Sequence, residues 1–287
     1  MSLFLLNNGN TKKYILEKVP GAAAAYSFRQ LSKKYCEACI RVRRSSDNAE
    51  TDIGFLNNNL DTVSLLSFVG SGNGFITKWY DQSGNNNYCA QSTAGKQPQI
   101  VTGGIVNKIN NKPAIRFYSA NINSLLINNT ALFANKPGAG LFSVCSITSA
   151  NSLKTLFFAS GISSSRIRLD ITAASVFEVG GRRLDSDSYV ATTGTTVLTT
   201  NVLKIISAIF DTPNANLKTF IDCSTEKNIE FQTAGNFSNT NSGSVEIGSL
   251  FSTSNNFEGY LSELIIYNSA IQNGLLIQNN QKNHFGV

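Results

Sequence analysis

The sequence predicts an all-β fold, a sandwich or barrel with a few short helices. Three observations lead to this prediction. Strand-like apolar runs recur at short spacing from about residue 97 onward, turn-forming residues separate them, and only 15% of the 287 residues are charged. Asn, Ser, Thr and Gly fill the remainder, as in many turn-rich β proteins. A chain of this length buries roughly three quarters of its unfolded surface, so it can form a core without disulfides.

The start of the chain predicts an arm followed by one large domain. Residues 1–20 are expected to form an N-terminal arm or docking segment, and residues 21–287 the main domain. Within the arm, Tyr14 to Leu16 is a candidate strand. The run from Ala22 to Leu31 predicts a helix, because four alanines favour helical backbone.

The next hundred residues alternate between strands and turns. Ile40 to Arg43 alternates apolar and basic residues, which is typical of a half-exposed strand. Asp61 is placed to cap a short helix that runs through Phe68. The glycines of residues 70–74 end that helix and lead into an apolar strand that finishes at Trp79, the only tryptophan.

Beyond residue 97 the pattern is strand after strand, with one helix predicted near the end from Ala270 to Gln281. No internal repeat is present. The predicted strands are Ala114 to Phe117, Leu141 to Thr148, Leu153 to Ala159, Arg166 to Ile171, Ser175 to Val179, Leu203 to Phe210, Leu217 to Cys223, Val245 to Gly248 and Tyr260 to Tyr267.

Charge and cysteine content exclude several classes of function. The net charge of +6 is concentrated before residue 45, but no nucleic-acid-binding motif accompanies it, so a solvated strand edge is favoured over a nucleic-acid surface. Cys36 and Cys39 form a CxxC without a second CxxC or a partner histidine, which argues against a zinc site. Reduced thiols in a cytosol are expected. No signal peptide or membrane-spanning run is expected.

The stretch around Trp79 is the first candidate site, since sugars are bound by flat apolar rings combined with hydrogen-bonding side chains. The structural alternative is that Trp79 and Tyr80 are core residues of a strand and that the Asn-rich run is a loop. The candidate carbohydrate-binding residues are Trp79, Tyr80, Asp81, Gln82, Asn85, Asn86 and Tyr88, with Asp170 added from the resemblance described below.

Paired carboxylates are the second candidate, because glycoside hydrolysis uses two of them about 5–10 Å apart. With 18 acidic residues in the chain, several near strands are expected by chance. His284 is the only histidine, which argues against a Ser-His-Asp triad. The acidic residues on or beside predicted strands are Asp170, Glu178, Glu246, Glu258 and Glu263.

Three strings carry a resemblance to a known family. Ala25 to Ser27, Ile40 to Asp47 and Trp79 to Gly84 resemble, in that order, the catalytic domain of fungal arabinofuranosidase B (glycoside hydrolase family 54). Bacteriophage structural and tail proteins are similar over a longer part of the N-terminal half, in the runs Gly21 to Leu31, Arg41 to Asn48, Asp52 to Phe55 and Trp79 to Asn85. Phe257 to Asn268 resembles the closing strand of a laminin G-like domain. The resemblance implies a concanavalin A-like jelly-roll β-sandwich.

Function does not follow from that fold alone. The resemblance places the family's nucleophile at Thr172, two residues beyond Asp170, and its proton donor at Leu250. With both carboxylates missing, neither glycosidase mechanism can run. We therefore expect a catalytically inactive relative.

The expected role is that of a bacteriophage virion protein in a tail, fibre or capsid decoration, assembled in the host bacterial cytoplasm. Its expected partners are other virion proteins, further copies of itself and host-surface glycans, with no nucleic acid and no membrane. No cofactor is expected, although the superfamily is compatible with Ca²⁺. Two alternatives stay open: an arabinofuranosidase-type hydrolase that uses Glu178, Glu246 or Glu258, and an architectural component that binds no sugar.

Overall fold

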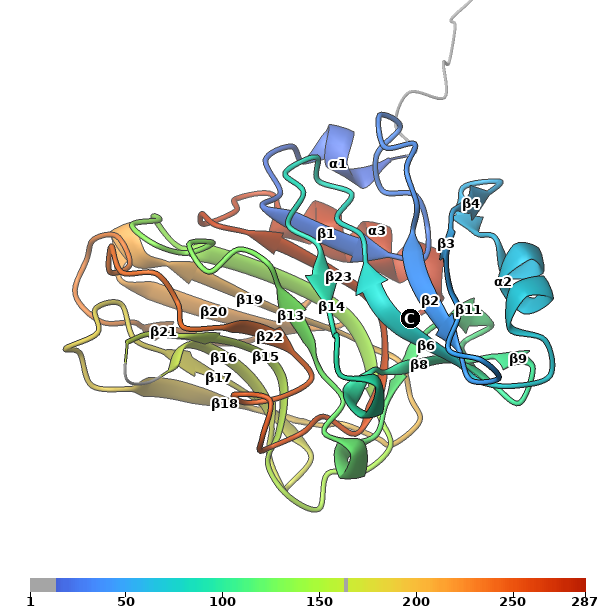
Figure 1. Ribbon diagram of the computed structural model, residues 1–287. Helices are drawn as coiled ribbons and strands as arrows, with labels where there is room; N and C mark the ends of the chain where they lie inside the picture. Colours follow the sequence, from blue (N-terminus) through green and yellow to red (C-terminus); the bar gives the residue numbers. More distant parts are fainter. Residues whose placement is uncertain (1–13, 163–164) are drawn as a thin grey trace, which may run out of the picture.

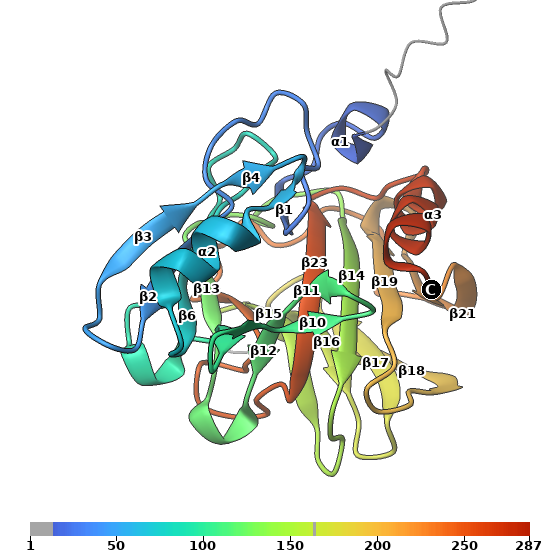
Figure 2. The same cartoon turned by 90° about the vertical axis from the view of Figure 1, so that its right-hand side faces the viewer.

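The computed structural model describes residues 14–162 and 165–287. Most of this chain belongs to one large antiparallel sheet that folds into two packed layers (Figures 1 and 2). The first layer consists of β1 (Ala24–Ser27), β12 (Ile115–Phe117), β23 (Gly259–Tyr267), β14 (Ala139–Ile147), β19 (Lys204–Asp211), β20 (Asn216–Ile221) and β21 (Ser224–Glu230).

The second layer is a continuous series of paired strands. It consists of β3 (Glu50–Ile53), β2 (Ile40–Arg44), β6 (Gly74–Trp79), β7 (Cys89–Ala90), β13 (Leu125–Ile127), β22 (Val245–Ile247), β15 (Lys154–Ser160), β16 (Ser165–Ile171), β17 (Val176–Gly181) and β18 (Val190–Val197).

The two layers are joined at both edges. At one edge β8 (Gln99–Thr102) pairs with β6 and with β12, and β9 (Ile105–Val106) extends it. At the other edge the Glu226 carboxylate on β21 accepts hydrogen bonds from the backbone N–H groups of Thr195 and Thr196 on β18. The sheet is therefore nearly closed, which leaves few unpaired strand edges.

Within the described residues, three helices and two small hairpins complete the fold. The helices are α1 (Ile15–Lys18), α2 (Thr62–Val69) and α3 (Gly274–Phe285), with 3₁₀ turns at residues 94–96, 119–121 and 212–214. The hairpins are β4–β5 (Phe55–Leu56, Asn59–Leu60) and β10–β11 (Lys108–Ile109, Lys112–Pro113). The predicted all-β sandwich with a few short helices is confirmed. No helix among the described residues is both long and apolar enough to cross a membrane.

The main core lies between the two layers, and a second apolar cluster lies outside the first layer. Strands β14 and β23 lie between the two clusters, so both of their faces are buried. Along β23 the side chains alternate: Leu264 and Ile266 face the main core, and Ile265 and Tyr267 face the second cluster. Helices α1 and α3 cover this outer face (Figure 2) and contribute Ile15 and Ile277. Burial of such side chains is the main favourable term in folding.

Most sequence predictions of strands are confirmed, and so is the helix that Asp61 caps. The Asp61 carboxylate accepts hydrogen bonds from the backbone N–H groups of Val63 and Ser64, which are free at a helix N-terminus. The final helix begins four residues later than predicted and ends at Phe285. Strands β18 and β21, whose side chains are largely polar, are not among the predicted strands.

Two predictions near the start of the chain are wrong. The predicted helix from Ala22 to Leu31 contains strand β1, which pairs with β23 in the register Ala24↔Ile266. Its small side chains are completely buried, so sheet pairing and burial outweigh the helix preference of alanine. The candidate strand at Tyr14 to Leu16 is instead the start of α1.

The described part of the predicted arm packs on the main body. Ile15 and Val19 are buried, and the Tyr267 hydroxyl donates to the Val19 carbonyl at 2.6 Å. Residues 1–13 lie outside the described residues. A docking role for the arm stays a prediction.

Candidate functional site

Trp79, at the end of β6, is a core residue. Its side chain is completely buried. Its ring stacks on Phe28 with centroids 4.9 Å apart and packs at a tilt against Tyr26 with centroids 5.7 Å apart. A sugar at the surface cannot reach this ring. The expectation that Trp79 contacts carbohydrate is therefore corrected in favour of the structural alternative.

Asp81 and Gln82, which follow directly, hold the segment around β1 in place. The Asp81 carboxylate accepts hydrogen bonds from the backbone N–H groups of Ala25, Ser83 and Asn87 at 2.8, 2.8 and 2.9 Å, and from the Ser83 hydroxyl at 2.7 Å. The Gln82 amide accepts from the Leu31 N–H at 2.7 Å. Both side chains are buried and their polar atoms are used internally, so neither is available to a ligand.

Two asparagines of the following run add to these hydrogen bonds. We call the side chains of Asp81, Gln82, Asn85 and Asn87, which bond to the segment around β1, the clamp. Asn85 Nδ2 donates to the Ala22 carbonyl at 2.8 Å, and Asn87 Nδ2 donates to the Ala23 carbonyl at 2.8 Å. Asn86 is different: it is exposed, in the left-handed backbone region with φ +57°, a conformation that asparagine adopts more readily than most residues. Of the predicted cluster, Tyr80, Asn86 and Tyr88 reach the surface without being committed to this clamp.

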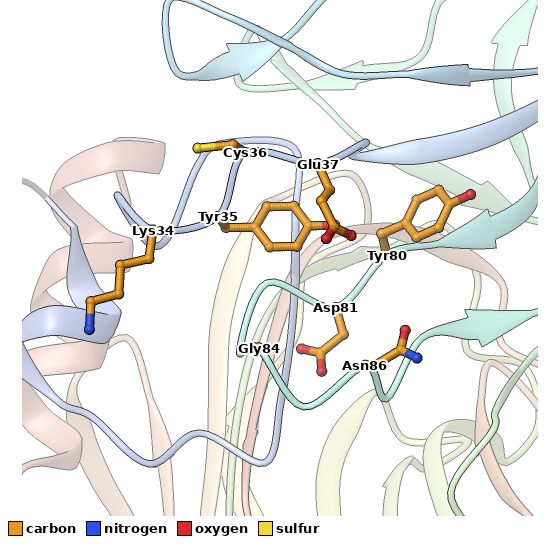
Figure 3. Close-up of a pocket in the computed structure, with 8 residues that line it drawn as sticks. All are labelled: Lys34, Tyr35, Cys36, Glu37, Tyr80, Asp81, Gly84 and Asn86. Atoms are coloured by element: carbon orange, nitrogen blue, oxygen red, sulfur yellow. The ribbon is translucent and has the colours of Figure 1, made fainter.

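A cavity of about 370 Å³ opens beside Tyr80 and Asn86 (Figure 3). We call it the Tyr80 pocket. Figure 3 shows the Tyr35 and Tyr80 side chains on either side of the Glu37 carboxylate, with Asn86 below them. The lining residues are Lys34, Tyr35, Cys36, Glu37, Tyr80, Asp81, Gly84 and Asn86.

Sequence reasoning missed Tyr35 and Glu37. They lie in an irregular loop between β1 and β2, and their contribution depends on the chain folding back beside β6. The only signal in the sequence is an aromatic residue within an otherwise polar loop, and this does not distinguish it from any other loop tyrosine.

Both tyrosine hydroxyls of the Tyr80 pocket stay protonated at neutral pH. Burial, and then the nearby Glu37 carboxylate, raise the pKa of Tyr35 well above its usual value. Burial and a 2.8 Å hydrogen bond to Asp52 raise the pKa of Tyr80 to about 12. Besides Lys34 and the internally bonded Asp81, the pocket therefore offers two half-buried rings with neutral hydroxyls, the Asn86 amide and the Glu37 carboxylate, which is suited to a polar ligand with an apolar face.

Asp170 lies far from this pocket within the second layer. It is on β16, separated from β7 by β13, β22 and β15. Its carboxylate accepts from the Thr155 hydroxyl at 2.8 Å and pairs with Arg168, and its side chain is only 1% exposed. The structure does not bring Asp170 together with the residues around Tyr80, and burial prevents it from contacting a sugar directly.

The other candidate carboxylates are also engaged. Glu178 lies opposite Asp170 across β16 and β17 and accepts from Thr193. Glu246 is 2% exposed and accepts from the backbone and hydroxyl of Ser252. Glu258 pairs with Arg116, and Glu263 with Arg29.

All five cysteines are unpaired thiols. Cys39 is buried and its thiol faces the Ser27 carbonyl, while Cys36 is exposed. In residues 14–162 and 165–287, no group of three or more His, Cys, Asp or Glu side chains is arranged to hold a metal ion.

Comparison with known proteins gives one family match and a shared fold. Residues 13–139, less than half of the chain, match the family profile of the arabinofuranosidase B catalytic domain. A family 54 α-L-arabinofuranosidase soaked with a cyclic sulfate inhibitor is 17% identical with a TM-score of 0.63, and one complexed with arabinofuranosyl-α-1,2-xylobiose is 17% identical with a TM-score of 0.62. Each similarity covers 93% of this chain and 63% of the other.

The chain thus has the fold of these arabinofuranosidases and spans less than two thirds of their length. A carbohydrate-binding module of a Ruminococcus gnavus sialidase aligns with 51% of the chain at a TM-score of 0.44, too low to bear on function. No curated protein matches the sequence.

The family match contains the clamp and the Tyr80 pocket but ends before Asp170. Thr172 follows β16, and its backbone N–H donates to the Val176 carbonyl in a tight turn. Leu250 forms an isolated bridge with Ser254. At these two positions, to which the resemblance assigns catalytic carboxylates, the side chains are a hydroxyl and a hydrocarbon.

Asp170 and His284 are expected to give opposite pH dependences of stability. Burial raises the pKa of Asp170 to about 6, so its contribution is present below the unfolded value of about 4 and is lost as the pH rises through 6. Burial, and then the Arg29 charge, lower the pKa of His284 to about 4, so its contribution is present above about 6.5 and is lost as the pH falls through 4.

We therefore expect Asp170→Asn and His284→Gln to tilt the stability profile in opposite directions between pH 4.5 and 6.5. Stability of Asp170→Asn should rise with pH relative to the unmodified protein, and stability of His284→Gln should fall, each by at most about 1.4 kcal/mol per pH unit. Urea denaturation at several pH values measures this. Profiles parallel to that of the unmodified protein would contradict the assignment.

Proposed function

We propose that this protein binds carbohydrate without hydrolysing it, as a catalytically inactive relative of arabinofuranosidase B, and that the Tyr80 pocket is the binding site. The observation that carries the proposal is the contrast between two places in one fold. The Tyr80 pocket presents two half-buried tyrosine rings and the Asn86 amide at the surface. The positions assigned to the family's carboxylates hold Thr172 and Leu250.

Ring faces beside hydrogen-bonding groups match the chemistry of a sugar, which has apolar C–H faces and a polar rim of hydroxyls. Asn86 supplies both a donor and an acceptor. Because Asp81 and Gln82 fix the loop that carries Asn86, the pocket is preorganised, which reduces the entropic cost of binding.

We further propose that the protein is part of a bacteriophage particle, as a tail, fibre or head-decoration component and as a homo-oligomer, and that it attaches to host-surface glycans. This proposal rests on the sequence resemblance from Gly21 to Asn85. Immunogold labelling of particles with antibodies against the chain tests it, and particles that carry no label would count against it.

A hydrolase that uses other carboxylates is the second candidate, because Asp170 and Glu178 lie opposite one another on adjacent strands. Asp170 is buried under its partners, however, and Glu246 is equally covered. An enzyme that uses either of these two would have to uncover it, and one that uses Glu258 would have to release it from Arg116.

The experiment is a glycan-array measurement together with an assay on 4-nitrophenyl α-L-arabinofuranoside. We expect binding without turnover, and a loss of affinity of about tenfold or more in Tyr35→Ala and Tyr80→Ala, as for aromatic anchors of an interface. Tyr260→Ala is the matched control, since this half-buried tyrosine stacks near Arg116 on another surface.

Two outcomes would overturn the proposal. Turnover that disappears in Glu178→Gln or Glu246→Gln would establish an enzyme. Binding that is unchanged in both pocket variants would place the site elsewhere.

A further inference from the structure

A second cavity of about 360 Å³ lies next to the Tyr80 pocket, and we call it the Tyr88 pocket. The Tyr88 ring and Leu126 give it an apolar part, and the Leu126 side chain is 38% exposed. Lys96, Asn128 and Ser252 give it a polar part. These side chains come from separate segments that only the sheet brings together.

The two pockets are connected through Lys78 and through a hydrogen bond at their rim. In the β6–β7 register Lys78 lies opposite Ala90, and the Lys78 ammonium sits 4.1 Å from the Tyr88 ring centroid and 5.3 Å from that of Tyr80. At the rim, Asn128 Nδ2 donates to the Asn86 carbonyl at 3.1 Å. Asn86 lines the first pocket and Asn128 the second, and Lys78, which contacts both tyrosine rings, forms the floor between them.

Two lysines, Lys78 and Lys96, lie at the Tyr88 end of this floor. Within the described residues neither Lys78 nor Lys96 takes part in an ion pair. Lys96 donates one hydrogen bond, to the Ser252 carbonyl at 2.9 Å, which leaves two of its three N–H donors free. No acidic side chain lines the Tyr88 pocket.

The neighbouring carboxylates are paired or covered. Arg41 holds Glu50 at 2.8 Å and Asp52 at 3.2 Å, and Asp52 also accepts from Tyr80. Glu246 lies beneath Ser252 and is 2% exposed. The Tyr88 end is therefore electropositive, whereas the Tyr80 end carries both Glu37 and Lys34.

We propose that the two pockets form one groove for an acidic oligosaccharide, with a carboxylate-bearing sugar unit in the Tyr88 pocket between Lys78 and Lys96. This deepens the proposed function and rests on sugar binding at the Tyr80 pocket. A cation above an aromatic ring stays accessible from its open side, where it can form a charge-assisted hydrogen bond with a sugar carboxylate.

A single-stranded nucleic acid also combines anionic charge with flat rings. The observations favour a saccharide, because the Glu37 carboxylate lies between the Tyr35 and Tyr80 rings on which bases would stack, and there it would repel a phosphate backbone, although Lys34 lines the same pocket. Nucleic-acid binding is one outcome of the test.

The test compares three probes by isothermal titration calorimetry on the full chain: hexagalacturonate, its methyl ester, and a six-residue oligothymidylate. We expect the acidic hexamer to bind at least tenfold tighter than the ester and to weaken as salt is raised, because a hydrogen bond to a charged group contributes about this much. Lys78→Met and Lys96→Met should abolish that preference, while Lys218→Met on β20 should not.

The outcomes separate the two proposals. Equal binding of acid and ester that is lost in Tyr80→Ala would leave the proposed function standing and overturn the acidic groove. Tighter binding of the oligothymidylate would also overturn it. Binding of neither sugar form would contradict the groove here, and a negative glycan array would then reject the proposed function as well.

Discussion

Replacing Asp81 by alanine is expected to lower the free energy of unfolding by about 4 kcal/mol. The substitution leaves the buried backbone N–H groups of Ala25 and Asn87 without acceptors, and each unsatisfied buried donor costs roughly 1–3 kcal/mol. Loss of the two bonds from Ser83 loosens the loop further. Urea denaturation followed by fluorescence of Trp79, the only tryptophan, measures the change.

Asp47→Ala is the matched control for this prediction. Asp47 is also a carboxylate in a turn and bonds to Arg44, but it is exposed, so its removal should leave stability almost unchanged. If Asp81→Ala were no more destabilising than Asp47→Ala, the clamp would not be what holds β1 in the sheet.

Glu263→Ala is expected to cost about 3–5 kcal/mol, as for one partner removed from a buried ion pair. Glu263 on β23 is completely buried and accepts two hydrogen bonds from the Arg29 guanidinium, at 2.7 and 2.9 Å, and one from Ser27. Its removal leaves Arg29, whose side chain is 10% exposed, without a counter-charge.

The double variant Arg29→Met/Glu263→Met distinguishes a lost attraction from an uncompensated charge. It should be more stable than Glu263→Ala, because no buried charge remains. Burial opposes ionisation of Glu263, but the Arg29 charge and hydrogen bonds outweigh it and lower the pKa. This contribution is present above about pH 4.3 and is lost as the pH falls through the folded pKa. A double variant as unstable as Glu263→Ala would contradict this account.

Local sequence patterns correctly predict the strands and helices that are determined by residues close together in the sequence. The strands between Leu141 and Tyr267 carry apolar runs bounded by turn residues, and the Asp61 cap lies within three residues of its partners. The stretch from Trp79 to Gly84 is a candidate carbohydrate site in the sequence, but its role in holding the segment around β1 is not predicted. Asp81 and Gln82 bond to backbone more than 50 residues away, and side-chain-to-backbone bonds over that distance leave no periodic signal.

The same limit explains the errors. Ala24 and Ala25 favour a helix when only their neighbours are considered, yet their partners Ile266 and Ile265 are over 200 residues further along. The Tyr80 pocket likewise combines Tyr35 with Asn86, which only the folded sheet brings together. The sequence therefore predicts the part of the candidate site that lies in one stretch, Tyr80 and Asn86, and only the structure adds Tyr35 and Glu37.

The position of β23 has a consequence for how the protein forms. This strand from near the end of the chain pairs with β1, β12 and β14, which are all made much earlier. Pairings between such distant segments slow folding, because the entropy of closing large loops is lost before the contacts compensate for it. During synthesis, β14 has an unpaired edge and uncovered apolar side chains until β23 emerges from the ribosome, and in this interval the protein is most exposed to aggregation.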